Sequence, residues 1–439
     1  MVRSVISQVN PISRFSRSGG KLSPGSVPID RIIAKTGTPL YIYDANLMRQ
    51  QYNRLVKALP RSFTICYSMK ANPNPAVAKI FRKLGAGAEI ASKAELEAAL
   101  AGGFKPRDII YAGPGKTEDE LKDAMRSRIG VINVESETEL ERISKLSRRI
   151  NKNRKRAKTK IALRVNPDFT SGNKGEVMIG GSRKFGIDSE TIEPLILKTM
   201  ADPGLDLAGF HFYAGTGLLE AKTLIQAYKA FVRWMKKTSV RLKLDVGVIN
   251  FGGGLGIPYA DGENELDIKA VGAALKKITA NLAKSPGFKK TGFILEPGRY
   301  LAGPSGVYIS EVTDIKRSRG TLYVITNGGI NHSLIPIVLN RNYPTAILNK
   351  MNRRKKIECV VAGPLCASPD QFSRKVKLPK PEIGDLLGVF NSGAYGLTAS
   401  MLEFLSHPTP AEVLTDQGRA YLIRESRKPE FGGFKRLKI

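Results

Sequence analysis

Short apolar segments alternate with amphipathic segments along most of the first 300 residues. Eight of the apolar segments read as buried strands that end in Gly, Pro or Ser, and each is followed by a stretch compatible with a helix; they lie at 63–70, 87–92, 108–114, 130–136, 160–167, 207–215, 245–254 and 292–299. Near-continuous apolar runs are typical of parallel strands covered on both faces. Eight strand–helix units over about 250 residues predict an α/β fold of the (βα)8 TIM-barrel type. An open doubly wound sheet is the alternative, because the order of the strands in space is not visible in the pattern.

Three helix starts can be recognised separately from the strands. The segments Ser92–Glu95, Thr117–Glu120 and Ser136–Glu139 each place a glutamate three residues after a hydroxyl, directly behind a predicted strand. This spacing predicts a capping box, in which the hydroxyl and the glutamate accept each other's backbone N–H groups. The boxes therefore support the strand–helix alternation.

After Pro297 the pattern changes to β-rich runs separated by Gly, Pro and Asn. The runs lie at 306–318, 321–328, 356–364, 385–395 and 420–426. They predict a second, mostly antiparallel β-domain, which the strand-like segment 38–44 is expected to join. The expected division is a basic tail over 1–18, an N-terminal strand segment over 19–45, a cofactor-binding barrel over 46–299 and a C-terminal β-domain over 300–439.

The charge composition is unusual for a globular chain. Lys and Arg number 70 and Asp and Glu 39, which gives a formal net charge of +31. Such an excess favours acidic partners, among them nucleic acid, anionic lipid or an acidic protein. The densest basic run, Arg148–Lys160, has no interleaved aromatic residues and follows a helical stretch. We interpret this run as a solvated helix end and loop, so nucleic acid is a disfavoured partner.

Composition also excludes several other classes of protein. No apolar run approaches the roughly 18 residues that a membrane helix needs. The three cysteines, Cys66, Cys359 and Cys366, are too few for a disulfide framework and fit a reducing, cytoplasmic compartment. With three histidines and no CxxC pair, no His/Cys zinc site is expected.

Polar residues gather at the C-terminal ends of the predicted strands, where TIM barrels carry their reacting groups. Lys70 ends an apolar strand, and partial desolvation is expected to lower its pKa and permit a Schiff base, although a solvated strand cap is the simpler interpretation. The run Gly252–Gly254 lets backbone amides approach a phosphate. Glu296 and Arg299 form either a structural ion pair or a second part of the same site. Together these groups fit an aldehyde on a phosphorylated pyridine.

Five motifs extend this interpretation to a family. They are YSMKAN at 67–72, NFGGGLG at 250–256, EPGR at 296–299, GPLC at 363–366 and GAY at 393–395. In order and spacing, over residues 19 to 430, the chain resembles the fold-type III pyridoxal-phosphate decarboxylases, which act on diaminopimelate, ornithine and arginine. The resemblance implies a barrel with a β-domain, and a head-to-tail homodimer with shared active sites.

The resemblance also implies roles for individual residues. Lys70 would form the Schiff base with pyridoxal 5'-phosphate, Glu296 would keep the ring nitrogen protonated, and Cys366, from the second subunit, would reprotonate the substrate carbon. A small buried hydrophobic residue is the alternative interpretation of Cys366, and Cys66 and Cys359 are expected in the core. The implied cofactor-binding residues are Lys70, Glu89, Arg164, Tyr213, Thr216, Gly252, Gly253, Gly254, Glu296, Gly298, Arg299 and Tyr395.

Three departures from the family pattern bear on the substrate. Tyr213 stands where the family has a cofactor-stacking histidine, and the nearby His211 does not simply replace it. Ala367 stands where an acidic residue binds the distal ammonium group of a diamino acid. Ile335 and Leu339 align with the arginine and tyrosine that bind the distal carboxylate of diaminopimelate. Because a buried charge without a partner costs several kcal/mol, free diaminopimelate is poorly served.

The segments 341–344 and 393–399 resemble a different branch, which contains the carrier-protein-linked glutamyl decarboxylase of butirosin biosynthesis and the exosortase-associated decarboxylases. We therefore expect decarboxylation of a small amino-acid substrate whose distal end is masked or attached to an acidic carrier protein. A diaminopimelate decarboxylase that makes L-lysine is the alternative. A pyridoxal-phosphate racemase is less favoured, because racemases usually place an arginine on the ring nitrogen. A non-catalytic cofactor carrier is disfavoured by the β-domain.

Overall fold

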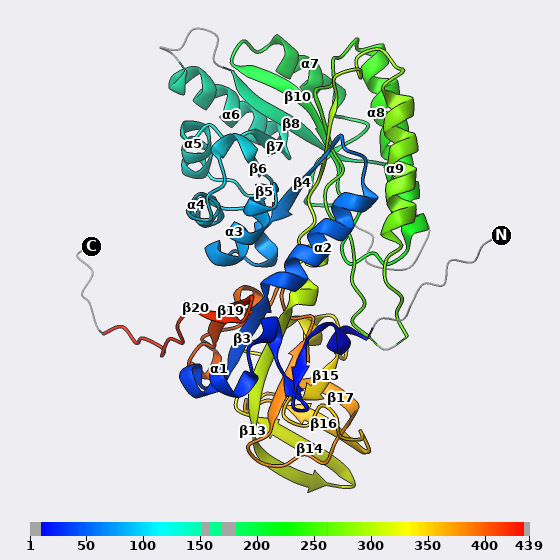
Figure 1. Cartoon of the computed structure of the whole chain (residues 1–439). Helices are drawn as coiled ribbons and strands as arrows, with labels where there is room; N and C mark the ends of the chain where they lie inside the picture. The colour runs from blue at the N-terminus through cyan, green and yellow to red at the C-terminus, as the bar shows by residue number, and fades with distance from the viewer. Residues whose placement is uncertain (1–9, 152–157, 169–180, 261, 434–439) are drawn as a thin grey trace, which may run out of the picture. The chain divides into compact units, whose positions relative to one another are not determined.

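The computed structural model describes residues 10–151, 158–168, 181–260 and 262–433. These residues divide into two compact units (Figure 1). Of the described residues, the barrel unit contains Met48–Pro258 and Asn264–Ala302, and the β-unit contains residues 10–47, residues 259–263 and the chain from Gly303 onward. No helix within the described ranges is long and apolar enough to span a bilayer.

The barrel unit is a closed ring of eight parallel strands. The strands are β4 (Phe63–Ser68), β5 (Gly87–Ile90), β6 (Ile109–Tyr111), β7 (Val131–Val134), β8 (Thr159–Asn166), β10 (Leu205–His211), β11 (Val248–Asn250) and β12 (Gly292–Leu295). They pair in chain order, and the short strand β9 (Ile187–Asp188) pairs with the end of β8. In addition, β12 pairs with β4, and β8 pairs directly with β10. The predicted TIM barrel is confirmed, and the open sheet is wrong because these two pairings close the ring.

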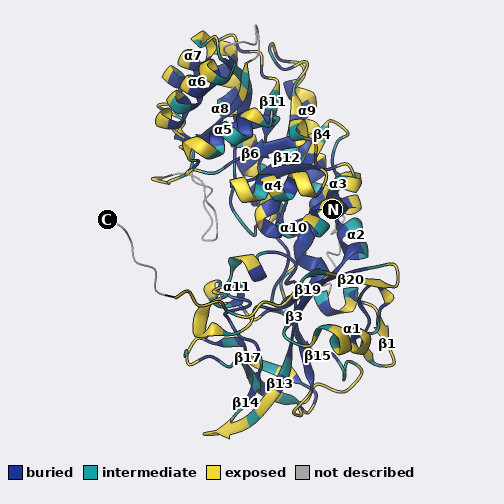
Figure 2. Ribbon diagram, turned by 90° about the vertical axis from the view of Figure 1, so that its left-hand side faces the viewer, coloured by how far each residue is buried: buried dark blue, intermediate teal, exposed yellow. Residues whose placement is uncertain are grey.

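Helices cover the outside of this ring. They are α2 (Ala45–Ala58), α3 (Pro75–Lys83), α4 (Lys93–Ala101), α5 (Glu118–Arg126), α6 (Glu137–Ile150), α7 (Glu193–Ala201), α8 (Ala221–Arg241), α9 (Ile268–Leu282) and α10 (Arg299–Ala302). Figure 2 shows the buried strands inside the barrel and helices with exposed outer faces. In the basic run Arg148–Lys160, α6 ends at Ile150, β8 begins at Thr159, and residues 152–157 lie outside the described ranges.

Only one of the three expected capping boxes is complete. Over Thr117–Glu120, the hydroxyl and the glutamate accept each other's backbone N–H groups. Over Ser92–Glu95 and Ser136–Glu139, the hydroxyl caps the helix as predicted. The two glutamates accept from the N–H groups of Ala91 and Glu135, each one residue before the cap. In these two loops the glutamate therefore fixes the end of the preceding strand instead of the cap residue.

The β-unit is built on a second sheet of nine strands. They are β3 (Leu40–Asp44), β13 (Gly306–Ser318), β14 (Thr321–Thr326), β15 (Thr345–Ile347), β16 (Ile357–Ala362), β17 (Gln371–Leu378), β18 (Leu386–Phe390), β19 (Ala411–Asp416) and β20 (Arg419–Arg424). The sheet is mostly antiparallel, as predicted, with parallel pairs β14–β16 and β3–β19. Strand β3 is buried at all five positions and lies between β13 and β19. Strands β15, β17 and β19 are additions to the predicted set.

The N-terminal segment differs from the expectation. Residues 1–9 lie outside the described ranges, but the part of the expected tail that is described, 10–18, is packed onto the β-unit. Ile12 and Phe15 are buried in its core, and the Phe15 ring lies 5.3 Å from that of Phe390. Residues 10–18 of the expected basic tail are therefore part of the β-unit, because two apolar side chains there gain free energy by burial.

Phe15→Ala is expected to lower the free energy of unfolding by about 3 kcal/mol or more, because a buried ring is replaced by a cavity. Thermal or urea unfolding of the full chain measures this change. Phe431→Ala is the matched control, since the Phe431 side chain is 80% exposed and its removal should change little. Equal unfolding curves for the two variants would contradict the packing of the N-terminal segment.

Candidate active site

Lys70 and Glu89 form an ion pair at the C-terminal end of the barrel. Lys70 lies in the short turn after β4, and its Nζ donates to both carboxylate oxygens of Glu89 at 2.7 Å. The hydroxyl of Ser68, the last residue of β4, donates to the same carboxylate. The Lys70 side chain is 41% exposed and that of Glu89 1%. The amine is therefore positioned by a buried carboxylate, while the side chain that carries it stays partly exposed.

Glu296 is a buried carboxylate directly after β12. It accepts from the side-chain amide of Asn250 at 2.6 Å, and its other oxygen lies 3.2 Å from Nε2 of His211. Burial raises the pKa of Glu296, but the His211 ring, the charge of Lys70 and the Asn250 amide outweigh it and lower the pKa to about 2. A carboxylate that stays ionised inside the barrel can hold a protonated ring nitrogen. The contact between His211 and Glu296 has no signal in the sequence.

The glycine run lies against the loops after β10 and β12. The N–H of Gly252 donates to the Asn250 side chain at 2.9 Å, and its carbonyl accepts from the Glu296 N–H at 2.8 Å. A Cβ atom on Gly253 would stand 2.5 Å from the Glu296 carbonyl oxygen, and one on Gly254 would stand 2.5 Å from that of Gly215. Only glycine allows these backbones to approach so closely. Thr216 lies half-buried in the neighbouring loop.

Arg164 is fixed by a residue that the sequence analysis did not select. Its Nη1 donates to Glu135 at 2.8 Å, and its guanidinium lies 5.8 Å from the ring of Tyr213, which packs on Gly252. Burial raises the pKa of Glu135, but the charges of Arg164 and Lys116 outweigh it and lower the pKa. Glu135 also accepts from the backbone N–H of Gly113 at 2.7 Å. Its position directly after β7 is the signal that could have identified it.

Gly298 brings the loop after β12 onto the Lys70 turn. A Cβ atom on Gly298 would stand 2.9 Å from Cβ of Ala71 and 3.0 Å from Cβ of Ser68. The backbone N–H of Ser68 also donates to the Pro297 carbonyl at 3.4 Å. Arg299 begins α10 directly after this contact. The barrel unit thus gathers Lys70, Glu89, Arg164, Tyr213, Thr216, Gly252, Gly253, Gly254, Glu296, Gly298 and Arg299 at one end of the strands.

Cys366 and Tyr395 belong to the β-unit. Cys366 is exposed, so its interpretation as a buried hydrophobic residue is wrong, whereas Cys66 and Cys359 are buried as predicted. The loop that carries Cys366 is fixed by the buried Asp370, whose carboxylate accepts from the backbone N–H groups of Leu365 and Ile330 at 2.8 Å. Tyr395 is half-buried, with a positive φ of 54°.

None of the three β-unit positions that align with the family's substrate-binding residues carries a charged side chain. Ile335 begins the short helix α11 (Ile335–Val338), Leu339 follows it, and both are half-buried, as is Ala367. Arg341, in the motif of the carrier-linked branch, donates to Glu263 at 2.9 Å. Its neighbour Tyr343 stacks on Tyr259 with ring centroids 4.2 Å apart.

The donor set of the barrel unit fits pyridoxal phosphate. Lys70 offers an amine for the aldehyde carbon, Glu296 offers an ionised carboxylate for the ring nitrogen, and the glycine run offers closely packed backbone for the phosphate. His211 Nδ1 is buried and has no hydrogen-bond partner among the described residues. The Glu296 carboxylate, which is itself held by His211 and Asn250, can keep a ring nitrogen protonated.

Glu95, in the first turn of α4, places a further carboxyl group near this site. Burial and the charge of Glu89 raise its pKa to about 7, although the Ala91 N–H and Lys70 act in the opposite sense. A pKa raised above the unfolded value means that the folded state favours the protonated form. The stability that this provides is therefore present below pH 4.5 and is lost as the pH rises towards about 7.

Glu95→Gln is expected to raise the melting temperature at pH 8 and to leave it nearly unchanged at pH 5, because the amide cannot ionise. A gain of about 1 kcal/mol at pH 8 is the scale expected after solvent screening. Thermal unfolding at the two pH values measures the difference. The matched control is Glu97→Gln, in the same helix at an exposed position. A pH-independent effect of Glu95→Gln would contradict the raised pKa.

Comparison with known proteins places the chain in a family. Residues 45–303 match the family described as pyridoxal-dependent decarboxylase, pyridoxal binding domain. The chain is 36% identical over 394 residues to L-glutamyl-[BtrI acyl-carrier protein] decarboxylase of Niallia circulans, which covers 88% of this chain and 91% of the relative. It is 31% identical over 428 residues to diaminopimelate decarboxylase of Aquifex aeolicus, which covers 97% of this chain and 98% of the relative.

The fold comparison agrees with the sequence comparison. Diaminopimelate decarboxylase of M. jannaschii, solved with L-lysine, matches with a TM-score of 0.86 and 27% identity, over 94% of this chain and 95% of that chain. The match extends over both units and over the barrel end that carries Lys70 and Glu296. The chain therefore belongs to the pyridoxal-dependent decarboxylases.

Proposed function

We propose that this pyridoxal-phosphate-dependent carboxy-lyase decarboxylates an amino acid whose distal end is attached to an acidic acyl-carrier protein. The similarity to the L-glutamyl-[BtrI acyl-carrier protein] decarboxylase, 36% identity over 88% of this chain, carries the proposal. The neutral residues Ala367, Ile335 and Leu339 support it, because a free distal ammonium or carboxylate group would meet no opposite charge from them.

The distribution of charge supports an acidic partner. Helices α8 and α9, which pack against each other, contain no Asp or Glu. Their exposed basic residues are Lys222, Lys229, Arg233, Lys236, Lys237, Arg241, Lys269, Lys276 and Lys277. Acidic residues are instead frequent on α4, α5 and α6. A one-sided basic surface accelerates association with an acidic protein in a salt-dependent way.

Each residue of the barrel site has a role in this proposal. Pyridoxal phosphate, when bound, supplies the electron sink for the bond between Cα and the carboxylate. Lys70 would offer its amine to the aldehyde carbon, and Glu89 orients that amine. Glu296 would accept a hydrogen bond from the protonated ring nitrogen, since His211 and Asn250 keep its carboxylate ionised. Tyr213 would offer its aromatic face to the ring.

The remaining roles concern the phosphate and the final proton. The resemblance implies that the glycine run, Thr216, Arg299 and Tyr395 would bind the phosphate. Cys366 delivers a proton to Cα in the site of a second copy of the chain, and its exposure in the single chain supports this. We infer a homodimer, which the exposed apolar side chains Met401 and Phe404, each 40% exposed, also support. The free cysteines fit a cytoplasmic enzyme.

Free diaminopimelate is the second candidate substrate. The observation that favours it is the 31% identity to diaminopimelate decarboxylase of Aquifex aeolicus over 97% of this chain. Ala367, Ile335 and Leu339 are the positions that argue against it. A racemase is less favoured, because Glu296 and its two hydrogen-bond partners occupy the place where racemases usually have an arginine.

Carbon dioxide release is expected from a glutamyl-loaded acidic acyl-carrier protein, and much less from free L-glutamate or free meso-diaminopimelate. The measurement uses enzyme whose cofactor content is verified by absorbance, at low and at high salt. The rate at limiting carrier concentration should fall with salt, because encounter is electrostatic. Lys70→Ala is the inactive control. Robust turnover of free diaminopimelate would instead support the lysine-forming alternative.

Cys366→Ala is expected to retain the bound cofactor but to lower kcat by about 100-fold or more, because a positioned proton donor contributes on that scale. Steady-state kinetics and product analysis in deuterated water measure the rate and the protonation at Cα. The matched control is Ser368→Ala, at an exposed position in the same loop. An unchanged rate and product would remove Cys366 from the reaction.

A further inference from the structure

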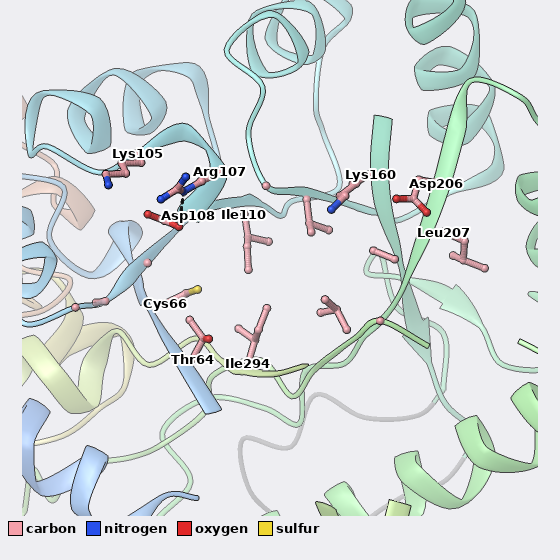
Figure 3. A pocket seen from close by; sticks show the side chains of 18 of the residues that line it. Thr64, Cys66, Lys105, Arg107, Asp108, Ile110, Lys160, Asp206, Leu207 and Ile294 are labelled. Carbon is pink, nitrogen blue, oxygen red and sulfur yellow. Dashed lines mark ion pairs between the residues drawn. The ribbon is translucent and has the colours of Figure 1, made fainter. Parts of the chain in front are cut away.

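A cavity of about 700 Å³ lies at the N-terminal ends of the barrel strands (Figure 3). Its wall includes Thr64 at the start of β4, Lys160 at the start of β8 and Asp206 at the start of β10. Because the strands are parallel, this end is opposite the end that carries Lys70 and Glu296. The interior of a TIM barrel is normally filled by layers of large side chains, so a hollow of this size is unusual.

Small residues on the strands or directly before them create the hollow. Gly87, Gly130, Ala208 and Gly247 all line it. A Cβ atom on Gly87 would stand 2.6 Å from the carbonyl oxygen of Asp108, so close packing requires a residue without a side chain there. The interior of the barrel is thus left partly unfilled at the N-terminal ends of its strands.

The floor of the cavity is apolar. It is formed by Cys66, Ile110, Val131, Val248 and Ile294, and Figure 3 shows the side chains of Cys66, Ile110 and Ile294 directed into the hollow. Ile294 and Val248 remain partly exposed although they lie on barrel strands. Apolar surface of this kind gains free energy when a ligand covers it, and the volume lies in the range of small-molecule pockets.

The floor also separates the cavity from the active site. Cys66 lies two residues before Ser68 on β4, and Ile294 lies two residues before Glu296 at the end of β12. One apolar layer therefore stands between the hollow and the carboxylates of Glu89 and Glu296. Burial, followed by the charges of Glu296 and Glu89, raises the pKa of the Cys66 thiol, which stays neutral.

Charges of both signs stand together at one side of the rim. Lys160 and Asp206 are register partners on the adjacent strands β8 and β10, and Figure 3 shows them side by side. Neither they nor the nearby Asp245 form an ion pair within the part of the chain that the structure describes. Arg107 and Asp108, elsewhere on the rim, lie 3.9 Å apart as an ion pair.

We propose that this cavity binds a free α-amino acid with an unbranched or branched apolar side chain. The ammonium group of the ligand pairs with Asp206, its carboxylate pairs with Lys160, and its side chain covers Cys66, Ile110 and Ile294. A simple anion would leave Asp206 without a partner, and a simple cation would leave Lys160 without one. A zwitterion with an apolar side chain pairs with both charges and covers the apolar floor.

The test is isothermal titration of the cofactor-loaded full chain with three probes that share the same butyl group. L-norleucine carries both charged groups, hexanoate lacks the amine, and pentylamine lacks the carboxylate. L-norleucine is expected to bind at least about tenfold more tightly than either, because each lost charge-assisted contact weakens binding on that scale. The absorbance of the bound cofactor, recorded in parallel, reports any amino acid that enters the active site.

Variants of the rim and wall assign the binding to this cavity. Lys160→Gln and Asp206→Asn should each weaken L-norleucine by about tenfold or more, and Ala208→Leu should abolish binding by filling the hollow. Lys79→Gln, at an exposed position on α3 that does not line the cavity, is the matched control and should bind normally. Retained cofactor absorbance and an unchanged melting temperature verify that each variant is folded.

Three results would overturn the proposal. They are no heat of binding for L-norleucine, equal binding of hexanoate or pentylamine, and binding that shifts the cofactor absorbance but is unaffected by Lys160→Gln and Asp206→Asn. The last result would assign L-norleucine to the active site. None of these readouts depends on carbon dioxide release, so they fail or succeed separately from the proposed decarboxylation.

Discussion

The charged state of Glu296 is the constraint on which the barrel site depends. A buried carboxylate is stable only if hydrogen bonds and opposite charge replace its hydration. Asn250 and His211 provide contacts at 2.6 and 3.2 Å from two neighbouring strands. The Glu296 backbone is in turn held by Gly252, and the same strand end leads to Gly298, which packs on the Lys70 turn. The positions of the amine, the carboxylate and the glycine run are thus mutually dependent.

The ion pair between Arg164 and Glu135, on the other side of the barrel, likewise replaces the hydration of a buried carboxylate. Glu135 is satisfied by Arg164 and by backbone N–H groups, so its charge is retained under burial. Below these polar groups, the barrel changes to a layer of small and medium apolar residues. That layer, which includes Cys66 and Ile110, stands between the carboxylates and the hollow at the opposite end. The hollow follows from residues such as Gly87 and Ala208, which line it and fill little space.

In the β-unit, a buried carboxylate likewise positions the loops that carry Cys366 and the substrate-related residues. Asp370 is buried, and its two oxygens accept from Ile330 and Leu365, so a single carboxylate joins the loop of the substrate-related residues to the loop of Cys366. The family assignment covers the chemistry, because the cofactor and the bond to be broken are shared by its members. The substrate that we propose rests instead on a few neutral positions, of which Ala367 and Ile335 are examples.

The periodicity of the sequence by itself determined the eight barrel strands, because parallel strands buried on both faces leave near-continuous apolar runs. It also predicted that Lys70 and Glu296 stand at the C-terminal ends of strands, where the structure has them. Tertiary structure decided the closure of the ring, the contact between His211 and Glu296, and the pairing of Arg164 with Glu135. These contacts join residues 85 and 29 positions apart in the chain. Such pairs depend on which strands become neighbours, and local pattern does not encode that choice. Strands β15 and β17 were not predicted, for a related reason. The first has only three residues, and the second mixes apolar with basic side chains, so the strands are recognised only by their pairing in the sheet.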